Sequence, residues 1–197
     1  MIAGLVLAAG ESSRMGRDKA LLVYRGRTFL ETIIAKLREG GIDRVAVVLG
    51  HHAPVIRQAL NLSEVEVVTN RDYLRGQTSS LQVGLVALAG LPAEAETLDA
   101  IVLCLVDHPA FEPATVSALV AAFACRRAAV VVPTHLGRRG HPVLIARPLF
   151  EPLLALSLRQ GANSVIGAWG DRTELLEVAD PGILVDVDDP ETYSRLR

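Results

Sequence analysis

The 197 residues of the chain suffice for one α/β domain with a complete hydrophobic core and are few for two. Half of them are hydrophobic and 21% are charged, which is typical of a soluble globular protein and excludes a disordered one. A formal net charge of −2 argues against a surface that coats nucleic acid. We therefore expect a single domain over residues 1–197 with no nucleic-acid partner.

Cys104 and Cys125 show no CxxC or Cys/His ligand spacing, so they indicate a reducing compartment rather than a metal or disulfide framework. The apolar run at the N-terminus is short and has no basic region before it. It predicts a buried strand, not a signal peptide or a membrane span. The expected localisation is cytoplasmic, with no membrane partner.

Short apolar runs alternate with segments of helical spacing from the N-terminus to about residue 133. Strands are expected at Ile2–Ala8, Arg44–Leu49, Val65–Thr69, Ala100–Val106 and Ala128–Val132. Helices are expected at Thr28–Gly40, Ala53–Leu60, Ser79–Ala89 and Pro113–Arg126. The runs are continuously apolar, which indicates strands that are covered on both faces, as in a parallel sheet. The order of elements predicts a mostly parallel, doubly wound, three-layer αβα sheet of the Rossmann-like kind.

The pattern changes after Pro133. A polar loop, Thr134–Gly140, leads to an apolar run at Pro142–Ala146, and a helical stretch follows. Two further strands are expected at Glu174–Val178 and Ile183–Val187. We expect this C-terminal part to add a small mixed edge to the same domain.

A glycine-bracketed loop, residues 9–19, follows the first strand. Glycines let backbone N–H groups approach phosphate oxygens, while Arg14 and Lys19 supply positive charge. Lys19 is one of only two lysines among 20 basic residues, the other being Lys36. The spacing fits neither the Walker motif nor GxGxxG. The loop predicts phosphate binding, and a solvated basic turn is the alternative.

Carboxylates follow at two places. Asp107 ends the apolar run at 101–106, on the edge of the sheet that carries the loop, where it suits Mg²⁺ or else caps a turn. Asp186 and Asp188 would share one face of a strand and could form a second set of metal ligands. Alternatively, Asp188 or Asp189 caps a helix that starts near Pro190.

Two further polar segments are candidates for substrate contacts. Gln77 could recognise a base edge and Ser79 and Ser80 could face a ligand, although capping of the following helix is the simpler interpretation. The basic loop at 137–142 could bind an anionic second substrate or remain a solvated turn. The pair His51-His52 has no third ligand at metal-binding spacing, so we interpret it as part of a loop.

Together these segments resemble the MobA-like nucleoside-triphosphate transferase family, and within it the molybdenum-cofactor cytidylyltransferases. Its motifs LAAGxSxRMGxxKxLL, GQxxSLxxGL, DxP, GRRGHPV and DxDxPE are matched by residues 7–22, 76–85, 107–109, 137–143 and 186–191. The matches keep the family order and span nearly the whole chain. Two positions depart from the pattern: His108 stands where glutamine is frequent, and Asp189 replaces a common threonine.

The resemblance implies a nucleotide-diphospho-sugar transferase fold and a set of residue roles. Lys19, Arg14 and Asp107 would be catalytic. The nucleotide would be bound by Leu7, Ala8, Ala9, Gly10, Ser12, Arg14, Lys19, Gln77, Ser79 and Ser80. Metal ligands would be Asp107, Asp188 and, with less support, Asp186, and acceptor contacts would be made by Arg138, Arg139 and His141.

The implied reaction is transfer of CMP from CTP to the terminal phosphate of molybdopterin, with Mg²⁺ (or Mn²⁺) as cofactor and pyrophosphate as leaving group. The sequence Leu-Ala-Ala-Gly at residues 7–10 resembles the cytidylyl branch. The alternatives are a guanylyl or other NTP transferase for another pterin or sugar phosphate, and a non-catalytic nucleotide-binding partner that delivers a cofactor to an apoenzyme.

Overall fold

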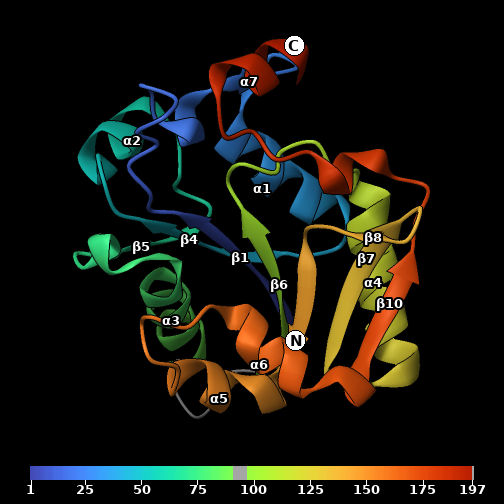
Figure 1. Cartoon of the computed structure of the whole chain (residues 1–197). Helices are drawn as coiled ribbons and strands as arrows, with labels where there is room; N and C mark the ends of the chain where they lie inside the picture. The colour runs from blue at the N-terminus through green and yellow to red at the C-terminus, as the bar shows by residue number, and fades with distance from the viewer. Residues whose placement is uncertain (91–96, 197) are drawn as a thin grey trace.

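A twisted sheet forms the middle layer of the protein in the computed structural model, which describes residues 1–90 and 97–196 (Figure 1). Its strand order within these residues is β10-β7-β9-β6-β1-β4-β5, and β8 pairs with β7. The strands are β1 (Ile2–Ala8), β4 (Arg44–Leu49), β5 (Glu66–Thr69), β6 (Ala100–Leu105), β7 (Val130–His135), β8 (Arg138–Arg139), β9 (Val143–Ala146) and β10 (Thr173–Glu177). A two-stranded ribbon, β2 (Val23–Tyr24) and β3 (Arg27–Thr28), lies apart from this sheet.

The pairing is mostly parallel, as predicted. β1 runs parallel to β4 and β6, β4 to β5, and β7 to β10. β9 is antiparallel to both of its neighbours, β6 and β7, and β8 is antiparallel to β7. The antiparallel strands lie in the C-terminal half, so the expected small mixed part is confirmed.

Helices cover both faces of the sheet because both faces are apolar. On one face α1 (Phe29–Glu39), α2 (Ala53–Ala59) and α4 (Pro113–Arg126) share a core that includes Ile33, Ile56 and Leu119. On the other face lie α3 (Gln77–Ala89), α5 (Phe150–Leu154) and α6 (Ala162–Ala168), seen below the sheet in Figure 1. No helix in the described part of the chain combines the length and apolarity needed to span a bilayer.

Short elements complete the chain. They are the 3₁₀ turns Lys19–Leu21, Tyr73–Arg75, Arg147–Leu149, Gly170–Arg172 and Pro181–Leu184, and the C-terminal helix α7 (Pro190–Leu196). One glycine shows how closely α3 packs: a Cβ on Gly84 would stand 2.5 Å from a methyl group of Leu5 in β1. Only a residue without a side chain therefore fits at this point of contact between helix and sheet.

The strand order reverses between β1 and β6. The chain runs from β1 to β4 and β5 on one side, then returns to β6 on the other side of β1. The connections that leave β1 and β6 therefore diverge and open a crevice at the carboxyl edge of the sheet, where open α/β sheets bind ligands. The glycine-bracketed loop and Asp107 both start at this edge.

The prediction of a strand at Ile183–Val187 is wrong. Residues 181–184 form a 3₁₀ turn, and the extended residues after it make only single contacts, such as Val187 N–H to the Asp107 carbonyl at 2.9 Å. The apolarity of this segment has another cause, since Ile183 and Val187 are fully buried against the body of the protein.

The polar loop expected at Thr134–Gly140 is in part a hairpin. β7 continues to His135 and pairs with β8 through a tight turn in which Leu136 and Gly137 have positive φ. The strand expected at 128–132 begins later than predicted, at Val130, and its pairing with β8 extends it through the polar residues Thr134 and His135.

Asp180 holds the start of the C-terminal segment in place. Its buried carboxylate accepts hydrogen bonds from Glu112 N–H (2.7 Å), Thr115 Oγ1 (2.6 Å) and Gly182 N–H (2.9 Å). We expect Asp180→Ala to lower the free energy of unfolding by about 2–3 kcal/mol, because hydrogen bonds to a charged acceptor are strong and buried donors would lose their partner. Urea denaturation measures the change, with the exposed Asp171→Ala as control.

Candidate functional site

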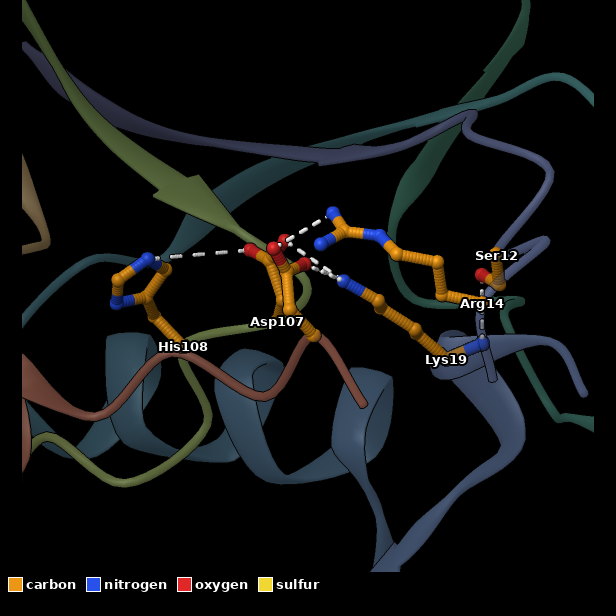
Figure 2. A network of polar contacts seen from close by, with 6 residues as sticks. Ser12, Arg14, Lys19, Asp107 and His108 are labelled. Atoms are coloured by element: carbon orange, nitrogen blue, oxygen red, sulfur yellow. Dashed lines mark hydrogen bonds and ion pairs between the residues drawn. The ribbon is translucent and has the colours of Figure 1, made fainter. Parts of the chain in front are cut away.

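The loop after β1 folds back on itself and directs the side chains of Arg14 and Lys19 into the crevice. Ser12 adopts a positive φ of 52°, its carbonyl accepts from Met15 N–H at 2.9 Å, and its Oγ accepts from Lys19 N–H at 3.1 Å. These contacts close the loop, so Arg14 and Lys19 point the same way although four residues lie between them (Figure 2).

Both cations meet carboxylates from distant parts of the chain. Lys19 Nζ lies 3.1 Å from Asp107 Oδ2 and 2.5 Å from Asp188 Oδ1, and Arg14 Nη2 lies 2.7 Å from Asp188 Oδ2. The Lys19 side chain is only 11% exposed, whereas that of Arg14 is 71% exposed. The structure therefore brings together four residues that the sequence predicted for triphosphate and metal binding.

Burial by itself would lower the pKa of Lys19, but hydrogen bonds and charge attraction from Asp188 and Asp107 outweigh it and raise the pKa above its ordinary value. The same hydrogen bond from Lys19 lowers the pKa of Asp188. The ammonium and the carboxylate are therefore both charged at neutral pH, which is the state needed to bind phosphate and a divalent ion.

Asp107 is positioned by backbone contacts and by a buried lysine. Val106 N–H donates to the Leu7 carbonyl at 3.1 Å, which extends the pairing of β6 with β1 by one residue. Lys36 on α1 donates from Nζ to the Pro109 carbonyl at 2.9 Å and is only 9% exposed. Burial lowers its pKa. The sequence noted Lys36 only as the second lysine, and its periodicity on α1 does not reveal this contact.

Three possible metal ligands gather beside the ion pairs. Asp107, His108 and Asp186 each offer an atom, and all three atoms lie within 4.8 Å of one another. Asp107 Oδ1 is buried and has no hydrogen-bond donor among the described residues, as expected of an oxygen kept for a cation. Burial and the nearby Asp107 charge raise the pKa of Asp186. This donor set fits a divalent metal ion.

The sequence did not assign His108 to the metal group. The one available signal was its replacement of the frequent glutamine. Asp188 has both carboxylate oxygens hydrogen bonded, to Lys19 and Arg14. Asp189 is the residue that caps α7, since its Oδ1 accepts from Thr192 N–H at 2.8 Å.

A polar cavity of about 290 Å³ occupies the crevice. Among the predicted site residues, its lining includes Leu7, Ala9, Gly10, Ser12, Arg14, Lys19, Gln77, Ser80, Asp107 and Asp188. The residues Ser13, Tyr73 and Gly76 also line it. Ser13 and Gly76 lie in the predicted motifs but were not among the predicted site residues, and Tyr73 lies outside those motifs.

Ala8 and Ser79 are absent from the lining residues of this cavity. The side chain of Ala8 belongs to the core beneath the loop. Ser79 Oγ donates to the carbonyls of Gly76 and Asp72 and accepts from Asn70, which also donates to Ser80 Oγ at 3.0 Å. The N-cap of α3 is Gly76, with no side-chain cap, so the expected capping by serine is not observed.

A second cavity of about 480 Å³ adjoins the first, and Leu7, Gln77 and Leu105 line both. Aliphatic side chains dominate its walls: Leu81, Leu103, Val132, Val143 and Ile166. Of the predicted acceptor residues, Arg139 and His141 line it and Arg138, which is exposed on β8, does not.

His141 is a neutral group in the wall of the second cavity. Burial and the neighbouring His108, whose ring centroid lies 4.8 Å away, lower the pKa of His141 to about 4. At neutral pH its imidazole therefore carries no charge and can offer one donor and one acceptor to a ligand.

Comparison with known proteins finds relatives that align along nearly the whole chain. The nicotine blue oxidoreductase of Paenarthrobacter nicotinovorans is 32% identical over 99% of this chain and 96% of its own length. The molybdenum cofactor cytidylyltransferase of Escherichia coli K12 is 24% identical over 96% of this chain and 92% of its own.

Among solved structures, Rv0371c of Mycobacterium tuberculosis H37Rv superimposes with a TM-score of 0.81, at 30% identity, over 99% of this chain and 96% of its own. A second structure of Rv0371c, described as a complex with manganese, has a TM-score of 0.73 at 30% identity and covers 99% and 97% of the two chains. The model of the MobA-like NTP transferase domain matches residues 4–174, so the chain belongs to that family of nucleotidyltransferases.

Proposed function

We propose that the protein, acting as one domain over its whole length, transfers CMP from CTP to the terminal phosphate of a molybdopterin-type acceptor and releases pyrophosphate. The observation that carries the proposal is the pairing of two cavities with a shared wall. One holds the cations and carboxylates needed at a triphosphate, and the other is lined mainly by aliphatic side chains.

The residues of the first cavity suit an in-line transfer. Lys19 and Arg14 would bind the phosphates of CTP and stabilise the charge that builds up in the transition state. Asp107 and Asp186 would hold Mg²⁺ or Mn²⁺, which when bound neutralises phosphate charge and polarises the α-phosphate. Asp188, predicted as a metal ligand, would instead keep Lys19 and Arg14 in place, because both of its oxygens are paired with them. The acceptor is itself a phosphate monoester with a second pKa near 6, so its oxygen is already anionic at neutral pH and needs no strong general base.

The second cavity favours a ring-shaped acceptor over a sugar phosphate. Its aliphatic side chains, such as Leu81, Leu103 and Ile166, would pack against the faces of a planar ring, and its polar side chains would bind the polar groups at the edge of that ring. The polar side chains that line this cavity are Gln77, Thr78, Arg139, His141 and Asn163. The name of the Escherichia coli relative, a molybdenum cofactor cytidylyltransferase, supports the same acceptor class and the same nucleotide.

Ala9 supports the choice of cytosine. It lines the polar cavity, it is 5% exposed, and its carbonyl accepts from His51 N–H at 3.1 Å, so its methyl group is held in place. The Ala9 side chain also packs in the core beside Gly50. In this proposal its methyl group keeps the wall of the cavity closer to the base than a glycine would, which favours the smaller pyrimidine.

We expect Ala9→Gly to raise the relative use of GTP over CTP by about tenfold or more, because one methyl group in a pocket discriminates by that order. The measurement is kcat/KM for GTP and for CTP, and the prediction concerns the ratio of these two values. An unchanged ratio would show that position 9 does not choose the base. The control should change one methyl group without straining the backbone, which rules out Gly41→Ala because φ at Gly41 is +93°. Ala168→Gly, at the end of α6, is a better one because Ala168 lies outside both cavities.

A redox reaction on a planar ring is the second candidate, because a relative that aligns along nearly the whole chain bears the name nicotine blue oxidoreductase. The apolar cavity would accommodate such a ring. The loop after β1 does not have the GxGxxG spacing of dinucleotide-binding folds, and the Lys19–Asp107 pair has no evident part in hydride transfer. The test of this candidate is the oxidation of a reduced nicotinamide dinucleotide with a ring-shaped dye as the hydride acceptor, followed by absorbance.

The decisive experiment presents CTP, GTP, ATP and UTP separately with Mg²⁺ or Mn²⁺ and molybdopterin, and measures pyrophosphate release and the mass of the product. We expect release with CTP and a product that carries CMP. Pyrophosphate release with a sugar phosphate but not with molybdopterin would show that the proposed acceptor is wrong. A preference for another nucleotide would show that CTP is not the substrate. Tight nucleotide binding without turnover for any acceptor would favour a non-catalytic delivery partner.

A further inference from the structure

The metal group differs from a purely carboxylate site because it contains an imidazole. His108 directly follows Asp107 in the turn after β6, and its backbone N–H donates to the Leu105 carbonyl at 3.1 Å. Its side chain is 12% exposed, so the turn holds the ring in the protein beside Asp107. Figure 2 shows the His108 ring on the opposite side of Asp107 from Lys19.

Asp107 divides its two oxygens between these neighbours. Oδ2 accepts from Lys19 Nζ at 3.1 Å, and Oδ1 lies 4.0 Å from His108 Nε2. This separation is too long for a hydrogen bond. Two atoms bound to one ion by bonds of about 2.1 Å can be up to about 4.2 Å apart, so the gap matches two ligands on either side of an ion.

The other groups around this gap are also without partners. Asp107 Oδ1 and His108 Nδ1 are buried without a hydrogen-bond partner in the part of the chain that the structure describes. Nε2 presents its lone pair to an ion when the ring proton is on Nδ1, and no described group competes with the ion for Nε2, since its contact with Asp107 is longer than a hydrogen bond. Asp186 supplies the third atom of the group, while Asp188 is occupied by Lys19 and Arg14.

We infer that His108 is a direct metal ligand, and that its imidazole, together with Asp107 and Asp186, makes the site prefer a transition-metal ion such as Mn²⁺ over Mg²⁺. Mg²⁺ prefers oxygen ligands, whereas first-row transition-metal ions also bind imidazole nitrogen. Mn²⁺ binds least tightly of these ions, so it is the most demanding probe of the nitrogen ligand. A glutamine at this position would offer an amide oxygen instead, so the exchange of Gln for His changes the ligand chemistry without removing a ligand. The inference rests on the proposed function in one respect only, namely that the bound ion acts on the triphosphate of the nucleotide.

The test measures the metal itself rather than turnover. Mn²⁺ is titrated into the metal-free protein by electron paramagnetic resonance, and nitrogen coupling to bound Mn²⁺ is recorded by electron spin echo modulation. No nucleotide is present, so base nitrogens cannot contribute. We expect ¹⁴N coupling in the natural protein, its loss in His108→Gln, and Mn²⁺ binding at least about tenfold weaker in that variant, since even groups that only support metal ligands matter by 10- to 100-fold.

Two matched variants locate the signal. His52 is exposed and its Nδ1 lies 3.1 Å from Asp18, so His52→Gln removes another imidazole–carboxylate pair and should leave the coupling unchanged. His141→Gln removes the ring next to His108 and should also keep it. Mg²⁺ affinity, measured by competition with Mn²⁺, should change little in His108→Gln because an amide oxygen suits Mg²⁺.

Absence of ¹⁴N coupling in the natural protein, its persistence in His108→Gln, or its loss in His141→Gln instead would each overturn the inference. If His108→Gln fails to fold, the presence or absence of ¹⁴N coupling in the natural protein, together with the His141→Gln spectrum, still tests the inference. Failure of the proposed function is a separate result, because nitrogen-coupled Mn²⁺ without nucleotidyl transfer would refute the reaction and keep the ligand. Transfer without nitrogen coupling would do the reverse.

Discussion

Asp107→Ala is expected to lower kcat by on the order of 10³-fold or more while the protein stays folded. Asp107 contributes one oxygen to the metal group and the other to Lys19, so its loss removes a ligand and a partner of the catalytic cation at once. Polarisation of a phosphoryl oxygen by a bound ion contributes several kcal/mol, and each 1.36 kcal/mol corresponds to about a tenfold change in rate.

The fold should survive this change for a structural reason. Asp107 Oδ1 has no donor among the described residues, so truncation leaves no donor unpaired on that side, and Lys19 keeps its contact with Asp188. Pyrophosphate release gives kcat, and circular dichroism with a thermal melt reports the fold.

The matched control for Asp107 is Asp189→Asn. Asp189 lies in the same C-terminal acidic cluster as Asp188, but it caps α7, and asparagine caps a helix equally well. This variant should keep its activity. A folded Asp107→Ala protein with full turnover would refute the metal role of Asp107, and equal losses in the two variants would indicate a general charge effect instead.

The central sheet was predictable because its information is local. Each parallel strand is buried on both faces and therefore appears in the sequence as a continuous apolar run, as in β1, β4 and β6. The sequence also predicted that the loop after β1 lies near Asp107, because parallel strands present their carboxyl ends at one edge of the sheet.

The C-terminal segment was not predictable in the same way. Residues 183–187 are as apolar as a strand, but their burial comes from packing against distant elements, with Asp180 holding the turn before them. Asp188 nevertheless lines the polar cavity and Asp186 lies near Asp107, because the backbone bond from Val187 to Asp107 places this segment beside the turn after β6. Such a contact spans 80 residues and leaves no periodic trace in the sequence.

The second cavity and the metal role of His108 belong to the same class of long-range features. The cavity walls come from β1, α3, β6, β7, β8, β9 and α6, so no single segment contains its pattern. The sequence motifs located Arg139 and His141 near a substrate, and only the packing shows that the space around them is apolar.

Lys19→Met is expected to lower kcat by roughly 10²–10³-fold, the size of effect found when one group that stabilises transition-state charge is removed. Methionine keeps the length and apolar stem of the side chain and deletes only the ammonium. Because the contacts with Asp188 and Asp107 raise the pKa of Lys19, the ammonium in the natural protein stays protonated throughout the usual assay range. No loss of activity below pH 10 should therefore come from its titration.

The way in which the rate falls tests the role of Lys19. A group that acts mainly in the transition state should lower kcat and kcat/KM together, whereas one that only binds CTP should raise KM at constant kcat. Arg17→Ala removes an exposed cation from the same loop that does not line the cavity, and it should change either constant little. If both variants lose the same small amount, Lys19 is no more than part of a solvated basic loop. If Lys19→Met alone loses kcat, the buried ammonium between Asp107 and Asp188 is the cation that stabilises the transferring phosphate.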